Sequence, residues 1–135
     1  MKRNLIVFSV LGFALLTAGP VVAHHGFMGM MDLRTPITFE GVITKVEWAN
    51  PHIVFYVDVV GADSKMTSWR FEGAGPGALT TRGWARTDLK HGEKIKIVGY
   101  RAKDGSFVAA ARSVTLPDGR TLEAASDGVP PLRAK

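Results

Sequence analysis

From residue 37 onward, apolar and polar residues alternate with a period of two in short segments that turn-forming residues separate. Such alternation is typical of β-strands with one buried face, and no segment keeps the 3.6-residue period of a long helix. The pattern predicts five strands, followed by a short terminal pairing segment: residues 37–48, 52–60, 66–72, 94–100 and 107–116. The alternation therefore predicts an all-β domain.

The first two strands carry the clearest signals. In the first, the apolar phase changes near Gly41, which predicts a bulge or a sharp coil at that glycine. In the second, alternate apolar side chains are expected to face the core: Ile53, Phe55, Val57 and Val59. His52 then lies on the opposite face of the strand.

A glycine-rich segment after the third strand leads into a short helix. Proline is well placed in the first turn of a helix, so Pro76 predicts a helix over residues 76–82. Three strands, a helix and two strands follow each other in the order of an OB-fold. An immunoglobulin-like sandwich would need about seven strands. We therefore expect a small five-stranded OB-like barrel with one short helix between strands three and four.

The N-terminus follows a different pattern. Lys2 and Arg3 precede an apolar run over residues 5–16, and small residues lead to Ala23. This is the order of a secretory signal, and the apolar run is shorter than the roughly 20 residues that a spanning helix needs. We expect cleavage after Ala23, a periplasmic or secreted protein, and no stable membrane anchor after cleavage.

The chain divides into four segments on this interpretation. Residues 1–23 form the cleavable signal and residues 24–36 an N-terminal extension. Residues 37–125 form the barrel, and residues 126–135, which are rich in glycine and proline, are predicted to be a disordered tail. Cleavage removes 23 of the 135 residues. The remaining 112 are enough for one domain with one core.

The composition of the chain argues against several classes of function. The chain has 17 Lys and Arg against 12 Asp and Glu, a formal net charge of +5, which the loss of Lys2 and Arg3 lowers to +3. The remaining basic residues are scattered, which argues against a nucleic-acid partner. Because the chain has no cysteine, disulfides, thiolate metal ligands and thiol nucleophiles are excluded.

The first residues of the predicted mature chain carry the main candidate chemistry. After cleavage, His24 would present both its α-amine and its imidazole, and the two together can chelate one metal ion. His25 adds a second imidazole, and three thioethers follow: Met28, Met30 and Met31. Amine and imidazole nitrogens suit Cu(II), and thioethers suit Cu(I). The segment therefore predicts a copper site.

The folded domain is expected to supply one further ligand. Pro51 biases Asn50 toward an extended conformation and delivers His52 at the start of the second strand. In an OB-fold this loop borders the usual binding face. Trp48 is expected to shield the site.

Each candidate also has a structural interpretation. The histidine pair can be a polar start to the mature chain, and the methionines can fill gaps in the core. His52 can stabilise its own turn, and His91 is expected to be a solvated turn residue.

Several stretches of the chain resemble a known family. They are the His-His-Gly-Phe start of the mature chain, a segment ending in Trp-Ala-Asn-Pro-His, an Arg-Gly-Trp triplet and a Gly-Tyr-Arg-Ala-Lys-Asp-Gly-Ser stretch: residues 24–27, 41–52, 82–84 and 99–106. They resemble a family of exported bacterial proteins classed as a domain of unknown function. The resemblance covers nearly the whole mature chain and implies export and a single compact β domain. It implies no activity.

Together these features favour a periplasmic copper-binding protein that acts as a chaperone or delivery module through His24. Its expected partner is a protein that donates or accepts the metal. The main alternative is a metal-free extracytoplasmic OB-type module that binds a protein or a saccharide. A copper-dependent oxidase of polysaccharides would use the same N-terminal chelate. Because the chain lacks the size for an extended substrate platform, we expect no enzymatic activity.

The position of the cleaved bond is directly testable. The intact mass of the protein recovered after export should equal that of residues 24–135, because the small-residue pattern ends at Ala23. A chain that begins at any other residue would lack the chelating amine of His24 and would exclude this form of the copper site.

Overall fold

The computed structural model describes the backbone of residues 21–132 and the side chains of residues 26–132. Within this part, six strands and two helices follow each other along the chain: α2 Val21–Met30, β1 Ile37–Glu47, β2 Val54–Val60, β3 Met66–Glu72, α3 Pro76–Thr81, β4 Lys94–Arg101, β5 Val108–Thr115 and β6 Thr121–Glu123. Most of the predicted signal falls on residues 1–20, outside the described part, so its cleavage stays a prediction. No described helix has the length and apolar character needed to cross a membrane.

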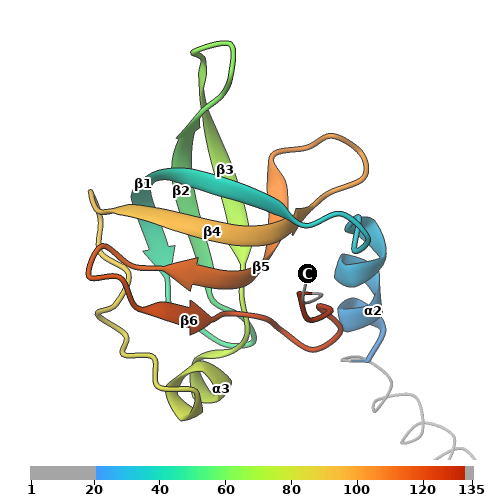
Figure 1. Ribbon diagram of the computed structural model, residues 1–135. Helices are drawn as coiled ribbons and strands as arrows, with labels where there is room; N and C mark the ends of the chain where they lie inside the picture. The colour runs from blue at the N-terminus through green and yellow to red at the C-terminus, as the bar shows by residue number, and fades with distance from the viewer. Residues whose placement is uncertain (1–20, 133–135) are drawn as a thin grey trace, which may run out of the picture.

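The strands close into a barrel (Figure 1). β1 pairs with β2 and β4, β2 with β3, and β4 with β5, all antiparallel, and the parallel pairing of β3 with β5 completes the ring. β6 extends the sheet beyond β5. The predicted five-stranded OB-like barrel, with one short helix between strands three and four, is thereby confirmed, and β6 is an additional strand.

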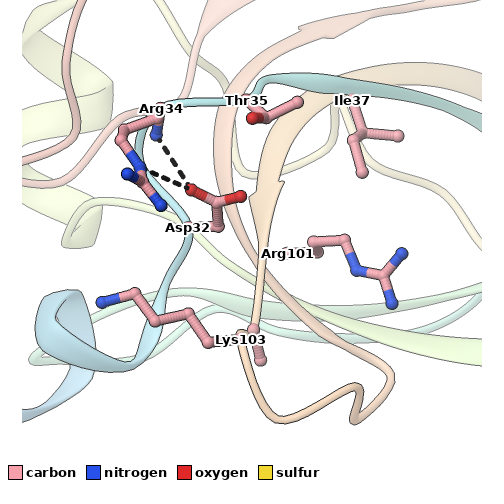
Figure 2. A pocket seen from close by; sticks show the side chains of 7 residues that line it. Asp32, Arg34, Thr35, Ile37, Arg101 and Lys103 are labelled. Carbon is pink, nitrogen blue, oxygen red and sulfur yellow. Dashed lines mark hydrogen bonds and ion pairs between the residues drawn. The ribbon is translucent and has the colours of Figure 1, made fainter.

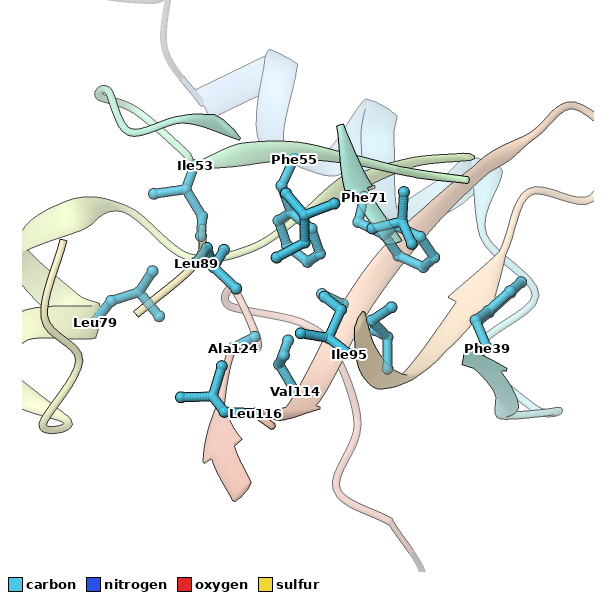
Figure 3. Close-up of a cluster of buried hydrophobic side chains, with 14 of the residues drawn as sticks. Phe39, Ile53, Phe55, Phe71, Leu79, Leu89, Ile95, Val114, Leu116 and Ala124 are labelled. Atoms are coloured by element: carbon cyan, nitrogen blue, oxygen red, sulfur yellow. The ribbon is translucent and has the colours of Figure 1, made fainter. Parts of the chain in front are cut away.

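Aromatic and aliphatic side chains fill the interior of the barrel (Figure 3). The rings of Phe55 and Phe71 stack with their centroids 5.4 Å apart. The sequence predicts one buried face for the second strand. On that face, Ile53, Phe55 and Val57 are completely buried, and Val59 packs at the edge of the core. The period-two alternation was therefore a sound guide to the core.

The phase change in β1 lies at Thr44, and the prediction of a bulge at Gly41 was wrong. The register with β2 shifts between Ile43 and Lys45, so Thr44 is the additional residue of the bulge. Gly41 has a different purpose. It is buried against β2, and a Cβ there would clash with the carbonyl oxygen of Asp58.

A second apolar cluster holds α2 against the outer face of β4 and β5. Its buried members are Met31, Tyr100, Ala102 and Ala110, and Phe27, Met28, Leu33, Val108 and Val129 pack around them. Lys103 donates a hydrogen bond from Nζ to the carbonyl of Gly29 at 2.8 Å, near the last turn of α2. The described part of the predicted N-terminal extension is therefore docked on the barrel.

The C-terminal strap, which we define as residues 124–130, also packs on the barrel, between its wall and α2 (Figure 1). Ser126 is buried, Val129 joins the second cluster, and the Tyr100 hydroxyl donates to the carbonyl of Pro130 at 3.3 Å. The sequence predicts disorder from residue 126, whereas the described residues of this segment are held by contacts. Composition does not show these contacts because their partners lie on β4 and α2.

The close approach of β1 to β2 predicts a specific sensitivity. Gly41→Ala should lower the free energy of unfolding by about 2 kcal/mol or more, because the buried backbones must separate to admit a methyl group. Urea denaturation measures the change. Gly77→Ala is the matched control: a Cβ at Gly77, in α3, meets nothing within 4 Å. Equal stability of the two variants would contradict the proposed contact.

Candidate functional site

His52 lies in the loop between β1 and β2, two residues before β2 begins. The Asn50–Pro51 peptide bond in this loop is cis. Ile53 donates its N–H to the carbonyl of Ala74 at 3.1 Å, and its own carbonyl accepts from the N–H of Gly73 at 3.0 Å. The backbone on the C-terminal side of His52 is thus tied to the segment that follows β3.

The carboxylate of Glu72, at the end of β3, holds the imidazole of His52. Oε1 of Glu72 lies 2.6 Å from Nδ1 of His52, and Oε2 accepts a hydrogen bond from Nη2 of Arg70 at 3.1 Å. An ionised carboxylate can only accept hydrogen bonds, so Nδ1 carries the proton. Glu72 therefore fixes the orientation of the imidazole of His52.

The burial of this pair follows from strand register. The side chains of His52 and Glu72 are only 15% and 11% exposed. On the outer face of the barrel, Glu72 lies beside Val54 of β2 and Ala110 of β5, and Ala110 lies beside Tyr100 of β4. Ala110 and Tyr100 belong to the second cluster. Glu72 thus borders the cluster that α2 covers, where water screens its charge poorly.

A small hollow of about 180 Å³ opens beside His52. The β1–β2 loop, the start of α3 and the C-terminal strap contribute its lining residues: Pro51, His52, Ala74, Gly75, Ala78, Arg82, Ser126 and Asp127. Gly75 allows the close approach of the loop to α3, because a Cβ there would lie 2.6 Å from the carbonyl oxygen of Pro51. Arg82 donates from Nη1 to the carbonyl of Ala125 at 2.6 Å, which fixes the strap at the edge of the hollow.

The three methionines predicted as copper ligands lie in different environments. Met31 is buried at the centre of the second cluster, as expected if the methionines fill gaps in the core. Met30 is 50% exposed. Met28 is partly buried and lies beside Gly128 of the strap, since a Cβ at Gly128 would be 3.3 Å from its Cγ. Met28 is thus in contact with the strap, but the hollow that it lines is another one, near the C-terminal end of α2.

The side chains of the two predicted N-terminal ligands, His24 and His25, lie outside the described part of the chain. Their backbone belongs to α2, about one helical turn before Met28. Whether they bind copper stays a prediction.

Trp48 and Asn50 were predicted to shield and position the site. Trp48 packs at the edge of the main core, with its ring centroid 6.3 Å from that of Trp84. Asn50 is exposed, and its Oδ1 would lie 3.8 Å from a Cβ at Gly75. Both residues therefore support the loop and its contact with the start of α3, and the shielding of a metal by Trp48 stays a prediction.

Sequence reasoning missed Glu72, Ser126 and Asp127. An acidic residue at the end of an apolar strand was the available signal for Glu72, but its partner lies 20 residues away along the chain. Nothing in the composition marks the other two residues. In the described part, no group of three or more His, Asp or Glu side chains is arranged to hold a metal ion. The hollow therefore offers one oriented histidine, and a metal ion bound there would need further ligands.

Two larger hollows, of about 430 and 470 Å³, lie near the C-terminal end of α2 and share Asp32, Arg34 and Lys103. Figure 2 shows the first of them, with Arg34 reaching back to Asp32. Nε of Arg34 is 3.7 Å from Oδ1 of Asp32, and Lys103 binds the carbonyl of Gly29. Because these charges support the turn after α2, we assign the candidate site to the hollow at His52.

Over residues 14–111, the chain matches a family of unknown function, DUF6152, and it belongs to that family. The resemblance to a family of unknown function is thereby confirmed, while export stays a prediction. No curated protein matches the chain. The matched region contains His24, His25, His52 and Glu72 but ends before the C-terminal strap.

The contact between His52 and Glu72 can be tested without any ligand. Glu72→Ala should lower the free energy of unfolding by about 2 kcal/mol, because a hydrogen bond to a charged group is lost in a buried place. Nitrogen-15 NMR should show that His52 no longer favours the proton on Nδ1. Glu40→Ala, which removes an exposed carboxylate, is the control. An unchanged tautomer in Glu72→Ala would contradict the orienting role of Glu72.

Proposed function

We propose that this protein binds copper outside the cytoplasm, as a chaperone or delivery module, and that His52 is the ligand from the folded barrel. The observation that carries the proposal is the 2.6 Å contact between Nδ1 of His52 and Oε1 of Glu72. Histidines that bind metals nearly always donate their second ring N–H to such a partner, which fixes the ring and makes it a stronger ligand. His52 has this support from Glu72.

The remaining nitrogen ligands would come from the N-terminus of the mature chain. Removal of the signal gives His24 a chelating amine and ring, and His25 adds a further imidazole. Both precede Met28 by about one turn of α2, and Met28 lies beside Gly128 of the strap. The strap also lines the His52 hollow, so the proposal requires the mature N-terminus to reach His52 along the strap.

A delivery role requires an exchange of the ion with a donor or acceptor protein. Met30, which is half exposed at the end of α2, is the thioether that such a partner can reach. Met31 is enclosed by the second cluster and takes no part in this exchange. A soft, exposed sulfur is suited to the transfer of Cu(I).

One observation favours the alternative function, a metal-free module that binds a protein or a saccharide. Phe107 is 54% exposed and meets the ring of Trp69 edge-on, with the centroids 5.4 Å apart. An accessible aromatic pair can pack on a sugar ring or an apolar side chain. This surface does not include the His52 hollow, so substitutions separate the two functions.

Copper titration of the mature protein, starting at His24, tests the proposal. His52→Ala should weaken Cu(II) binding at least about tenfold, and Glu72→Ala should weaken it by about 10- to 100-fold because the ring loses its orientation. Competition with a chelator measures both affinities, and electron paramagnetic resonance should show fewer nitrogen ligands in His52→Ala. His91→Ala removes an exposed histidine and should bind as the unaltered protein does.

Two further chains complete the experiment. One additional alanine before His24 separates the amine from the imidazole and should weaken binding as strongly as His52→Ala. Phe107→Ala should leave copper binding unchanged. Equal affinities across the whole series, or no affinity in the unaltered protein, would overturn the copper proposal and favour the metal-free module.

A further inference from the structure

The aromatic pair of Trp69 and Phe107 lies at the edge of the main core. The ring centroid of Trp69 is 4.7 Å from that of Phe39, a core residue. The N–H of Arg70 donates to the carbonyl of Phe107 at 2.9 Å, so the pairing of β3 with β5 extends to Phe107. Because Phe107 is 54% exposed and packs on Trp69, the barrel presents aromatic ring surface to the solvent here.

Arg101, the last residue of β4, lies on the same face of the sheet as this pair. It pairs with Ala109 of β5, and Ala109 pairs with Phe71 of β3. Phe107 and Trp69 precede these two residues by two positions, so strand alternation places their side chains on the face of Arg101. Diagonal neighbours on adjacent strands are within reach of a long side chain. The guanidinium of Arg101 can therefore lie beside the aromatic pair.

Arg101 also lines the hollow of about 430 Å³ that Figure 2 shows, and its side chain points away from Asp32 there. Arg34 and Lys103 are the other cations of the lining, and they contact Asp32 and the carbonyl of Gly29. No described residue forms a hydrogen bond or an ion pair with the guanidinium of Arg101. Three cations against one carboxylate make this lining positive, which favours an anionic ligand.

The indole N–H of Trp69 is a second unused donor at this place. Nε1 of Trp84 donates to the carbonyl of Glu123 at 2.8 Å, whereas no described residue accepts a hydrogen bond from the indole of Trp69. The N–H of a partly buried tryptophan usually has an acceptor. A ligand that lies on the aromatic pair can supply this acceptor through a hydroxyl group.

The backbone at this place does not favour the addition of a peptide strand. The carbonyl of Arg101 accepts from the N–H of Asp32 at 2.9 Å, and the carbonyl of Phe107 accepts from Arg70. A peptide that binds by strand addition needs free backbone groups. Recognition must therefore come from side chains, namely the aromatic rings, the guanidinium and the indole N–H.

From these observations we infer that the aromatic pair and Arg101 bind an acidic saccharide. The sugar ring packs on Phe107 and Trp69, and its carboxylate pairs with the guanidinium of Arg101, whose planar shape matches two carboxylate oxygens. A sugar hydroxyl accepts from the indole of Trp69. The inference goes beyond the proposed copper binding and does not depend on it, because none of these residues lines the hollow at His52.

Calorimetric titration of the metal-free mature protein with short oligomers of galacturonic, glucuronic and mannuronic acid tests the inference. Each oligomer is compared with its methyl ester, which keeps the sugar rings but removes the charge. At least one acid should bind at least about tenfold more tightly than its ester, because only the carboxylate forms a charge-assisted pair with Arg101.

Arg101→Gln should abolish the difference between acid and ester. Arg86→Gln, which replaces an exposed arginine between α3 and β4, is the matched control and should keep it. Phe107→Ala should weaken the binding of acid and ester alike, at least about fivefold, because both use the ring surface. NMR of the indole N–H of Trp69 should show a shift when the acid is added.

Three outcomes would overturn the inference: no binding of any of the three acids, equal binding of acid and ester, or tighter binding of single-stranded DNA than of every acid. Thermal unfolding should be the same for Arg101→Gln and the unaltered protein, because no described residue uses this guanidinium. The copper titration is independent of this test. A protein that binds no copper can still bind the acids, and a protein that binds no acid can still bind copper.

Discussion

The parallel pairing of β3 with β5 is the constraint on which the rest of the structure depends. It closes the barrel around the aromatic core and places Glu72 beside Ala110 on the outer face. Without this pairing, the end of β3 would be an open sheet edge in water, where a hydrogen bond between His52 and a carboxylate would stabilise little. Closure of the barrel therefore creates the sheltered position that the candidate site needs.

Two further segments cover the outer face of the closed barrel. α2 docks through the second cluster, and the strap lies between α2 and the barrel wall. The strap is tied at both ends, by the N–H of Ala74, which donates to the carbonyl of Ala124 at 2.8 Å, and by the Tyr100 hydroxyl, which donates to the carbonyl of Pro130. A chain with no cysteine thus holds both terminal segments by packing and hydrogen bonds. The same contacts hold the N-terminal helix on the barrel beside the strap.

The barrel holds His52 in a fixed orientation. His52 is held through its backbone at Ile53 and through its ring at Glu72. The proposed N-terminal ligands lie near the end of the chain, where a ligand can join or leave an ion without disturbing the core. A protein that accepts and releases a metal needs at least one ligand whose orientation the fold fixes, and His52 is such a residue. In a family of unknown function, the contact between His52 and Glu72 is the structural basis of the copper proposal.

The sequence by itself determined the strands, the helix that starts at Pro76 and the barrel class, because period-two alternation and a helix-starting proline are local signals. It also singled out His52, because the Asn-Pro-His motif marks a loop next to a strand. Tertiary structure alone decided that Thr44 forms the bulge. The alternation of apolar residues shows that the buried face of the strand changes, but it does not show which residue is left out of the pairing with β2. It alone brought Glu72 to His52, because this contact joins residues 20 positions apart that the pairing of β2 with β3 places side by side.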